Sequence, residues 1–200
     1  ELLNFEIQQA QKSNQKELFK LAYLEHGVRL AEHINNTNEG PMAGKQVITF
    51  ETKKEAEQWL SKNPQYKEDM QSVVYGQQTL NPITGQIETV FDNGVNLGDI
   101  AIMINENIKK NIDLGDWSSS NTVHHEVFHF ITDIMPTETL KDLRLKLDKQ
   151  LKASKDPKII EVMKLHAEKM ALYTSNRKGS NIDEYNREYF TVLSDVFAAF

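Results

Sequence analysis

The stretch "TVHHEVFHF", residues 122–130, contains two histidines one helical turn apart, His125 and His129, with Glu126 directly after the first. Side chains four residues apart lie on the same face of an α-helix, so both imidazoles can reach one metal ion. Glu126 lies about 100° further round the helix. A carboxylate at that place can take a proton from a metal-activated water and pass it to a leaving amine. The spacing therefore predicts two metal ligands and a general base.

The residues that flank the motif predict that its helix is buried. The helix spans about residues 122–135 and is ended by Pro136. Its apolar residues lie on nearly every side: Val127, Phe128, Phe130, Ile131 and Ile134. Buried imidazoles and carboxylates are costly unless they have partners, and one metal ion would partner both histidines. The alternative is that both histidines are hydrogen-bonded core residues and that Glu126 forms an ion pair.

Helical and strand patterns extend on both sides of the motif. The periods of apolar residues predict further helices over residues 13–36, 51–64, 137–153, 157–173 and 181–200. Thr52 and Glu55 have the spacing of a helix capping box, and Pro157 suits the first turn of its helix. Residues 45–50 and 98–108 read as strands, and residues 72–92 read as a hairpin that turns at 81–85. Short strands followed by helices indicate an α+β fold.

Length and composition indicate one domain over residues 1–200, with an N-terminal helical segment at 1–40. The chain of 200 residues is 39% hydrophobic and 26% charged, which is typical of a soluble globular protein. A net charge of −6 with dispersed Lys and Arg predicts no nucleic-acid partner. No apolar run reaches the roughly 20 residues of a membrane helix, and no signal peptide is visible, so we expect no membrane partner. The compartment is not readable from these residues.

Two further observations restrict the chemistry and the context. The chain contains no cysteine, so disulfides, thiolate nucleophiles and thiolate metal ligands are excluded. A metal would therefore be held by histidines and carboxylates. The chain begins at Glu1 rather than Met, which is typical of a processed form or of a piece of a larger polypeptide or assembly.

The motif "HHEVFH" resembles the HExxH signature of the zincin metallopeptidases, and the predicted order of elements is similar to the N-terminal part of that family. The resemblance covers roughly residues 45–200. It implies a zincin-like α+β fold: a small twisted mixed sheet, an edge strand beside a buried HExxH helix, and a helical C-terminal part. It also implies a Zn²⁺ cofactor. In that family the strand before the motif helix is a sheet edge that holds extended substrate, and "DIAIMIN", residues 99–105, falls in that place.

The resemblance also bears on the third zinc ligand, because catalytic zinc takes three protein ligands and leaves one position open. The metzincin branch has Gly and then His or Asp three and six residues after the second histidine, where this chain has Thr132 and Met135. The branch with a glutamate ligand from a later helix remains. The segment "EYFTVLSDVF", residues 188–197, resembles the "EFFAE"-type helix of lethal-factor-like peptidases, which favours Glu188 as the ligand.

Other residues compete for the roles in this later helix. Where that family has an acid four residues after the ligand this chain has Val192, so the role of orienting a histidine would pass to Asp195. Glu184 is the rival ligand, although its spacing from Asn181 is that of a helix cap, which explains it without metal. A thermolysin-like register would place Thr191 at the ligand position. Tyr185 and Tyr189 are candidates to stabilise an oxyanion, and their assignment stays open.

The prediction from these features is a zinc metallopeptidase, an endopeptidase that cleaves a protein or peptide substrate. His125, His129 and Glu188 would bind the metal, and Glu126 would act as general base. One alternative is a catalytically inactive zincin-like structural or binding module within a larger, for instance phage-encoded, protein. Hydrolysis of a non-peptide amide is a third interpretation, which shares the metal chemistry.

Overall fold

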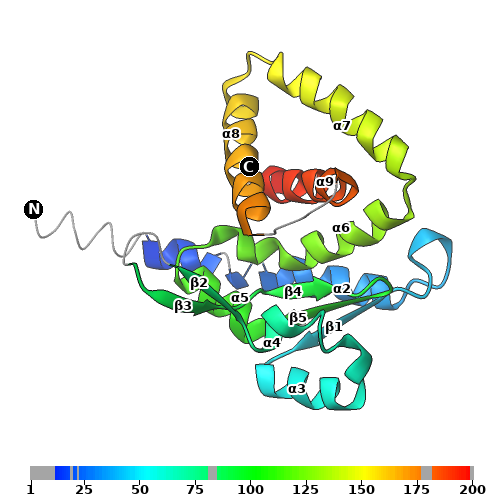
Figure 1. Ribbon diagram of the computed structural model, residues 1–200, viewed down its shortest axis with the longest axis vertical. Helices are drawn as coiled ribbons and strands as arrows, with labels where there is room; N and C mark the ends of the chain where they lie inside the picture. The colour runs from blue at the N-terminus through cyan, green and yellow to red at the C-terminus, as the bar shows by residue number, and fades with distance from the viewer. Residues whose placement is uncertain (1–11, 19, 22, 81–84, 177–181, 199–200) are drawn as a thin grey trace, which may run out of the picture. The chain divides into compact units, whose positions relative to one another are not determined.

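The computed structural model describes residues 12–18, 20–21, 23–80, 85–176 and 182–198. The protein has an α+β architecture that is mostly helical, as predicted (Figure 1). Its residues form two compact units, 1–126 and 127–200, each of which is described separately below. The prediction of one domain over residues 1–200 is not tested by this grouping and stays a prediction.

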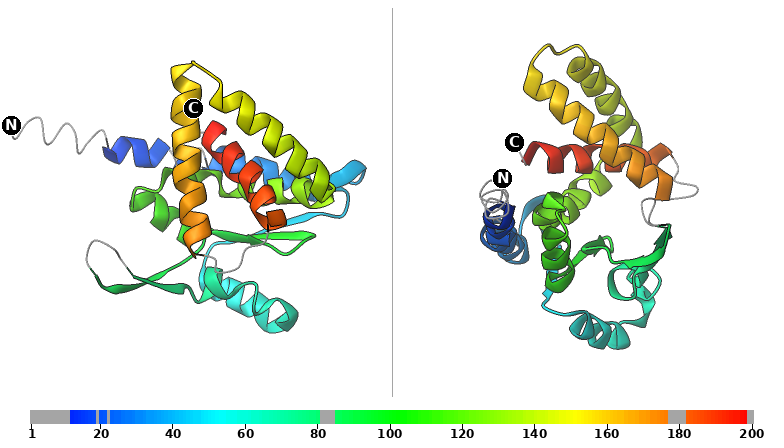
Figure 2. Two further views of the ribbon diagram at one scale, coloured as in Figure 1. Left: turned by 45° about the horizontal axis from the view of Figure 1, so that its top comes forward. Right: turned by 90° about the vertical axis from the view of Figure 1, so that its left-hand side faces the viewer.

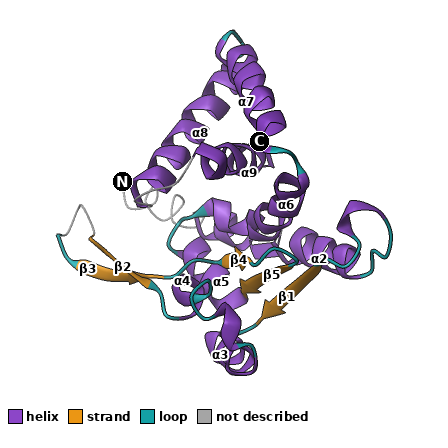
Figure 3. Cartoon of the chain, turned by 45° about the vertical axis from the view of Figure 1, so that its right-hand side comes forward, coloured by secondary structure: helices purple, strands orange, loops and turns teal. Residues whose placement is uncertain are grey.

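The first unit contains a mixed three-stranded sheet with the order β1-β5-β4. β5 (Ile100–Ile104) pairs in parallel with β1 (Gln46–Phe50) and antiparallel with β4 (Gly94–Asn96). The predicted hairpin forms a separate two-stranded sheet of β2 (Gln77–Leu80) and β3 (Ile87–Val90), as Figure 3 shows. In Figure 2 this hairpin extends away from the three-stranded sheet, and most of its turn lies outside the described residues.

β5 is buried on both of its faces, which makes it the centre of the first unit. Ile102 and Ile104 pack against α3 (Lys53–Lys62) and α4 (Gln71–Val74) on one face. Ala101 and Met103 alternate with them and are fully buried on the other face. The predicted cap of α3 is confirmed, because the Thr52 side chain accepts a hydrogen bond from the backbone N–H of Glu55.

Three features of this unit correct or extend the prediction. The expectation that "DIAIMIN" is a sheet edge is wrong, because β5 lies between two strands and β4 is the edge instead. β4 itself was not predicted. Residues 105–108, which were read as the end of a strand, are the first part of helix α5 (Asn105–Asp113). The predicted N-terminal helix is present in the described residues 12–35, with a π-helical segment at Tyr23–Gly27 before α2 (Val28–Asn35).

The motif helix α6 (Thr122–Ile134) follows the 3-10 helix η4 (Trp117–Asn121) and crosses from the first unit into the second. The second unit continues with α7 (Thr137–Lys152), α8 (Pro157–Asn176) and α9 (Ile182–Ala198), as the sequence predicted. An apolar cluster of α8 and α9 forms its core: Val162, Met170, Tyr189, Val192, Leu193 and Val196. Among the residues that the structure describes, no helix is both long and apolar enough to cross a membrane.

Candidate metal centre

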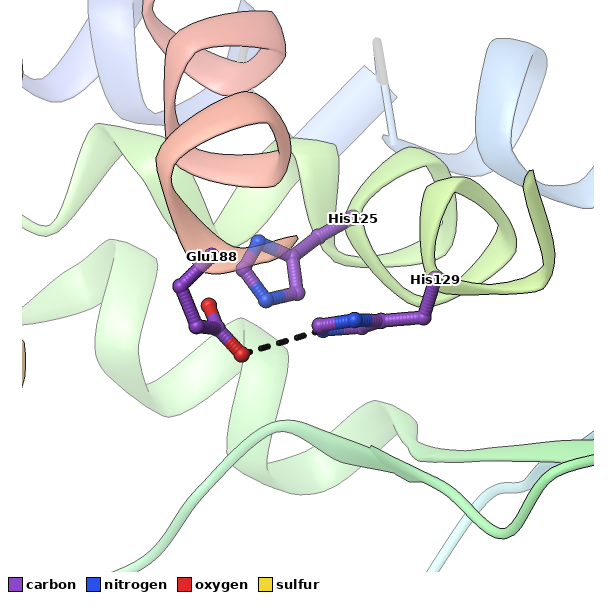
Figure 4. A group of neighbouring side chains, drawn as sticks. All are labelled: His125, His129 and Glu188. Atoms are coloured by element: carbon purple, nitrogen blue, oxygen red, sulfur yellow. Dashed lines mark ion pairs between the residues drawn. The ribbon is translucent and has the colours of Figure 1, made fainter. Parts of the chain in front are cut away.

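Helix α6 presents His125 and His129 on one face, as the spacing predicts (Figure 4). Both side chains are half-buried, whereas Glu126 between them is only 7% exposed. Val123, Val127 and Phe130 are buried, whereas Ile131 and Ile134 are 36% and 51% exposed. The predicted burial of the motif helix is confirmed for the first three residues and wrong for the two isoleucines.

Helix α9 brings Glu188 to the two histidines. Glu188 is 5% exposed, and its Oε1 atom lies 3.4 Å from Nε2 of His129 (Figure 4). One residue earlier on α9, Nη1 of Arg187 lies 3.3 Å from Oδ1 of Asp133, which follows His129 by one turn of α6. An ion pair and the His129–Glu188 contact thus link α6 and α9 at adjacent positions.

The donor set of this group suits zinc. One ligand atom each of His125, His129 and Glu188 lies within 4.8 Å of the others. Two ligand atoms each about 2.0–2.1 Å from one tetrahedral zinc ion lie roughly 3.3 Å apart. The distance of 3.4 Å between His129 and Glu188 agrees with that separation. Two imidazoles with one carboxylate are also the ligand chemistry of several catalytic zinc sites, in which the fourth position is left open.

Glu126 lies against the edge strand β4 of the first unit. A Cβ atom built at Gly94 would meet the main-chain oxygen of Ile102 at 2.7 Å and Cγ of Glu126 at 3.3 Å, so a side chain at this position would require β5 and Glu126 to shift. The Asn96 side chain donates a hydrogen bond from Nδ2 to the main-chain oxygen of Glu126, at 3.0 Å. Sequence reasoning missed both residues, because β4 is short and its Gly and Asn do not favour strands.

The other acidic candidates on α9 have different positions. Glu184 is half-buried and does not belong to the group of possible ligands around the two histidines. Asp195 is 5% exposed and lies two helical turns beyond Glu188. The Thr191 hydroxyl donates a hydrogen bond to the main-chain oxygen of Arg187 at 3.1 Å, which accounts for Thr191 without a metal. Of these four residues, Glu188 alone joins the two histidines, and its role as a ligand stays a prediction.

The two tyrosines of α9 line a cavity between α7, α8 and α9 with a volume of about 480 Å³. The Tyr189 hydroxyl donates a hydrogen bond to Oδ1 of Asp148 at 3.4 Å. The main-chain oxygen of Tyr189 contacts Nε2 of His166 at 3.0 Å. Burial, followed by the charge of Asp148, raises the pKa of Tyr189 to about 12. The Tyr185 ring lies 5.5 Å from the guanidinium of Arg144. These contacts assign both side chains to the helical core of the second unit.

Three other histidines, His26, His33 and His166, do not belong to the group around His125 and His129. His26 and His33 are exposed. His166 is 3% exposed and packs edge-on against Tyr189, with ring centroids 4.5 Å apart. Because a carbonyl only accepts hydrogen bonds, Nε2 of His166 carries the proton in its contact with Tyr189. Burial lowers the pKa of His166, so this ring is neutral near pH 7.

Comparisons with protein-family models, with curated proteins and with solved structures found no match for this chain. The case for a function is therefore carried by the residues of α6, α9 and β4 themselves.

Proposed function

We propose that this protein is a zinc-dependent peptidase in which His125, His129 and Glu188 hold the metal and Glu126 is the general base. The observation that carries the proposal is the His125, His129 and Glu188 group itself. Its two histidines come from an HExxH motif, and its third member comes from a helix more than 50 residues later in the chain. A zincin-like fold belongs to the same proposal.

The burial of these side chains supports a metal rather than a structural ion pair. Glu188 is nearly inaccessible to solvent, and its carboxylate faces His129, while His125 approaches the same space (Figure 4). A buried carboxylate is costly unless a positive charge or hydrogen bonds compensate it. A divalent ion bound by all three side chains would supply such a positive charge.

Zinc bound at this group would act as a Lewis acid, which activates water and polarises the carbonyl of the bond to be cleaved. Glu126 has the position of a base rather than of a ligand, because it follows His125 directly and lies off the face that the two histidines share. Its carboxylate would take the proton of the attacking water and deliver it to the leaving amine. This division of roles explains why an acid stands beside the ligands without joining them.

The edge strand β4 supports an extended peptide as the substrate. Leu97 N donates to Ile100 O and Ile104 N donates to Asn93 O, so residues 93, 95 and 97 turn their backbone groups toward β5. By the alternation of an antiparallel pair, the backbone groups of Gly94 and Asn96 turn to the outer side of β4. A substrate strand added there would pass beside Glu126. The role that the resemblance gave to "DIAIMIN" thus passes to β4.

The test of the proposal is cleavage of a random-sequence, quenched-fluorescent peptide library by the purified chain. We expect cleavage that stops when a chelator removes zinc and returns when zinc is added. Cleavage that continues at full rate in a zinc-free chain would contradict the metal mechanism. Stoichiometric zinc binding without any hydrolysis of peptides or of amide substrates would favour the inactive binding module.

A further inference from the structure

The side chain of Asn96 makes two hydrogen bonds that join different parts of the first unit. Its Oδ1 atom accepts from the backbone N–H of Gly98 at 2.8 Å, which fixes the turn after β4. Its Nδ2 atom donates to the main-chain oxygen of Glu126 at 3.0 Å. Each of the two ends of the amide thus has a separate partner. The orientation of Asn96 is fixed, and the edge strand is tied to α6 at the residue proposed as the general base.

Gly94 acts on the same residue from two positions earlier in β4. Residues 94 and 96 lie on the same face of the strand, because side chains alternate along it. A Cβ atom at Gly94 would approach the main-chain oxygen of Ile102 to 2.7 Å and Cγ of Glu126 to 3.3 Å. The glycine therefore permits close contact between β4 and the aliphatic part of the Glu126 side chain, while Asn96 holds the Glu126 backbone.

We propose that Asn96 is a positioning residue for the general base, with Gly94 providing the space that the base occupies. This inference rests on the proposed function of Glu126. Asn96 and Gly94 together set the distance between the Glu126 carboxylate and the outer edge of β4, where a substrate backbone would lie. Loss of the Asn96 donor would remove the tie between β4 and the Glu126 main chain. The distance between β4 and the Glu126 carboxylate would change, while His125, His129 and Glu188 stay on α6 and α9.

The test uses zinc and acetohydroxamic acid as probes, because neither requires a known substrate. Acetohydroxamic acid would bind a zinc ion held by His125, His129 and Glu188 as its anion, and Glu126 would take up the proton that the acid loses. Its affinity for the zinc-loaded protein therefore reports on the position of Glu126, and zinc affinity alone reports on the three ligands. Calorimetry measures both affinities for the wild type, Glu126→Gln and Asn96→Asp. Asn96→Asp keeps the acceptor for Gly98 and replaces the donor to Glu126 with an oxygen.

Asn35 provides a matched control in the same unit. Its amide also joins a helix to an edge strand, donating to Val47 O at 2.9 Å and accepting from Val47 N at 2.7 Å. Asn35→Asp removes an equivalent bond at β1, on the other edge of the sheet. A general loss of stability would affect both variants, whereas a displaced base would affect Asn96→Asp alone.

We expect Asn96→Asp to bind zinc as the wild type does and to bind acetohydroxamic acid about 10-fold to 100-fold more weakly, the range seen for residues that orient metal-site groups. Asn35→Asp should match the wild type in both affinities. Asn96→Ser is measured beside Asn96→Asp because it adds no charge: a serine hydroxyl still accepts from Gly98 and is too short to reach Glu126, so binding of acetohydroxamic acid should weaken in this variant also.

The results separate this inference from the proposed function. A folded Asn96 variant could bind acetohydroxamic acid as tightly as the wild type does, while Glu126→Gln binds it more weakly. This result overturns the role of Asn96 and leaves the proposed function in place. An equal loss in Asn35→Asp also overturns it. A wild type that binds no zinc, or a Glu126→Gln variant that binds acetohydroxamic acid normally, overturns the proposed function and the inference together.

Discussion

The guanidinium of Arg187 pairs with the carboxylate of Asp133 at 3.3 Å, directly beside the contact between His129 and Glu188. Arg187 precedes Glu188 on α9, and Asp133 follows His129 by one turn on α6. The ion pair therefore holds the two helices at the level of the candidate ligands. It also gives Asp133 a partner other than a metal.

Removal of this ion pair should weaken the site only modestly. Both side chains are about one-third exposed, and such pairs contribute at most about 1 kcal/mol. We expect Asp133→Asn to lower zinc affinity no more than about fivefold, which corresponds to that energy. Titration against a competing chelator measures the change in zinc affinity. Glu138→Gln, which removes the more exposed ion pair of Glu138 with Lys141 on α7, serves as the control. A loss above about a hundredfold would identify Asp133 as a ligand instead.

The choice between Glu188 and Glu184 gives a second prediction. Glu188→Ala should lower zinc occupancy sharply, because it removes a ligand and a compensating negative charge. Glu184→Ala should keep zinc and cost on the order of 1 kcal/mol of stability, the contribution of a helix-cap residue. Zinc content and melting temperature of the two variants decide between them.

The opposite result for this pair would be informative. If Glu184→Ala contains no zinc and Glu188→Ala keeps it, the third ligand is Glu184, one helical turn before Glu188. Asp195→Ala serves as an intermediate case, with zinc affinity about tenfold weaker if its buried carboxylate orients a histidine.

The general base is tested by Glu126→Gln. Glutamine keeps the size of the side chain and cannot accept the proton of the attacking water. We expect zinc content and melting temperature close to those of the wild type and loss of hydrolysis. Peptide cleavage by the zinc-loaded variant is the measurement. Turnover at the wild-type rate would show that another group accepts the proton.

The elements that were predicted correctly have local causes in the sequence. The motif helix follows from its run of apolar residues and ends before Pro136, and Thr52 caps α3 through its own side chain. The hairpin of β2 and β3 follows from two β-prone segments around a Pro and Gly turn. These signals lie within a few residues of the structure that they specify.

The features that were missed depend on contacts between distant residues. β4 has three residues, Gly94, Val95 and Asn96, and exists because it pairs with β5. α5 begins directly after β5 with Ile104 at its N-cap and no side-chain cap, so no start signal marks it. Glu188 was favoured over Glu184 through the resemblance, because helical periodicity does not fix which residue of α9 contacts His129.

His166 predicts a pH dependence of stability in the second unit. Burial lowers the pKa of His166, against the opposing effects of the Tyr189 carbonyl and of Asp148. The unfolded chain therefore takes up a proton near the ordinary value of 6.5, while the folded chain does so only at lower pH. This contribution to stability is fully present above about pH 6.5 and is lost as the pH falls through the folded pKa.

The comparison of the wild type with His166→Gln isolates this effect. Glutamine can still donate to the Tyr189 carbonyl and does not titrate. Urea unfolding from about pH 8 to about pH 5, in chelator so that zinc makes no contribution, should show a steeper loss of stability in the wild type than in the variant. Equal slopes would show that His166 takes up its proton at the same pH in both states.

The zinc content of the purified chain shows whether His125, His129 and Glu188 form a metal site. Elemental analysis before and after dialysis against a chelator, followed by dialysis against zinc, measures it without any substrate. We expect about one zinc ion per chain, lost with the chelator and regained afterwards, and a His125→Ala, His129→Ala double variant that contains no zinc. A natively folded chain that takes up no zinc would contradict the metal centre and the peptidase mechanism built on it.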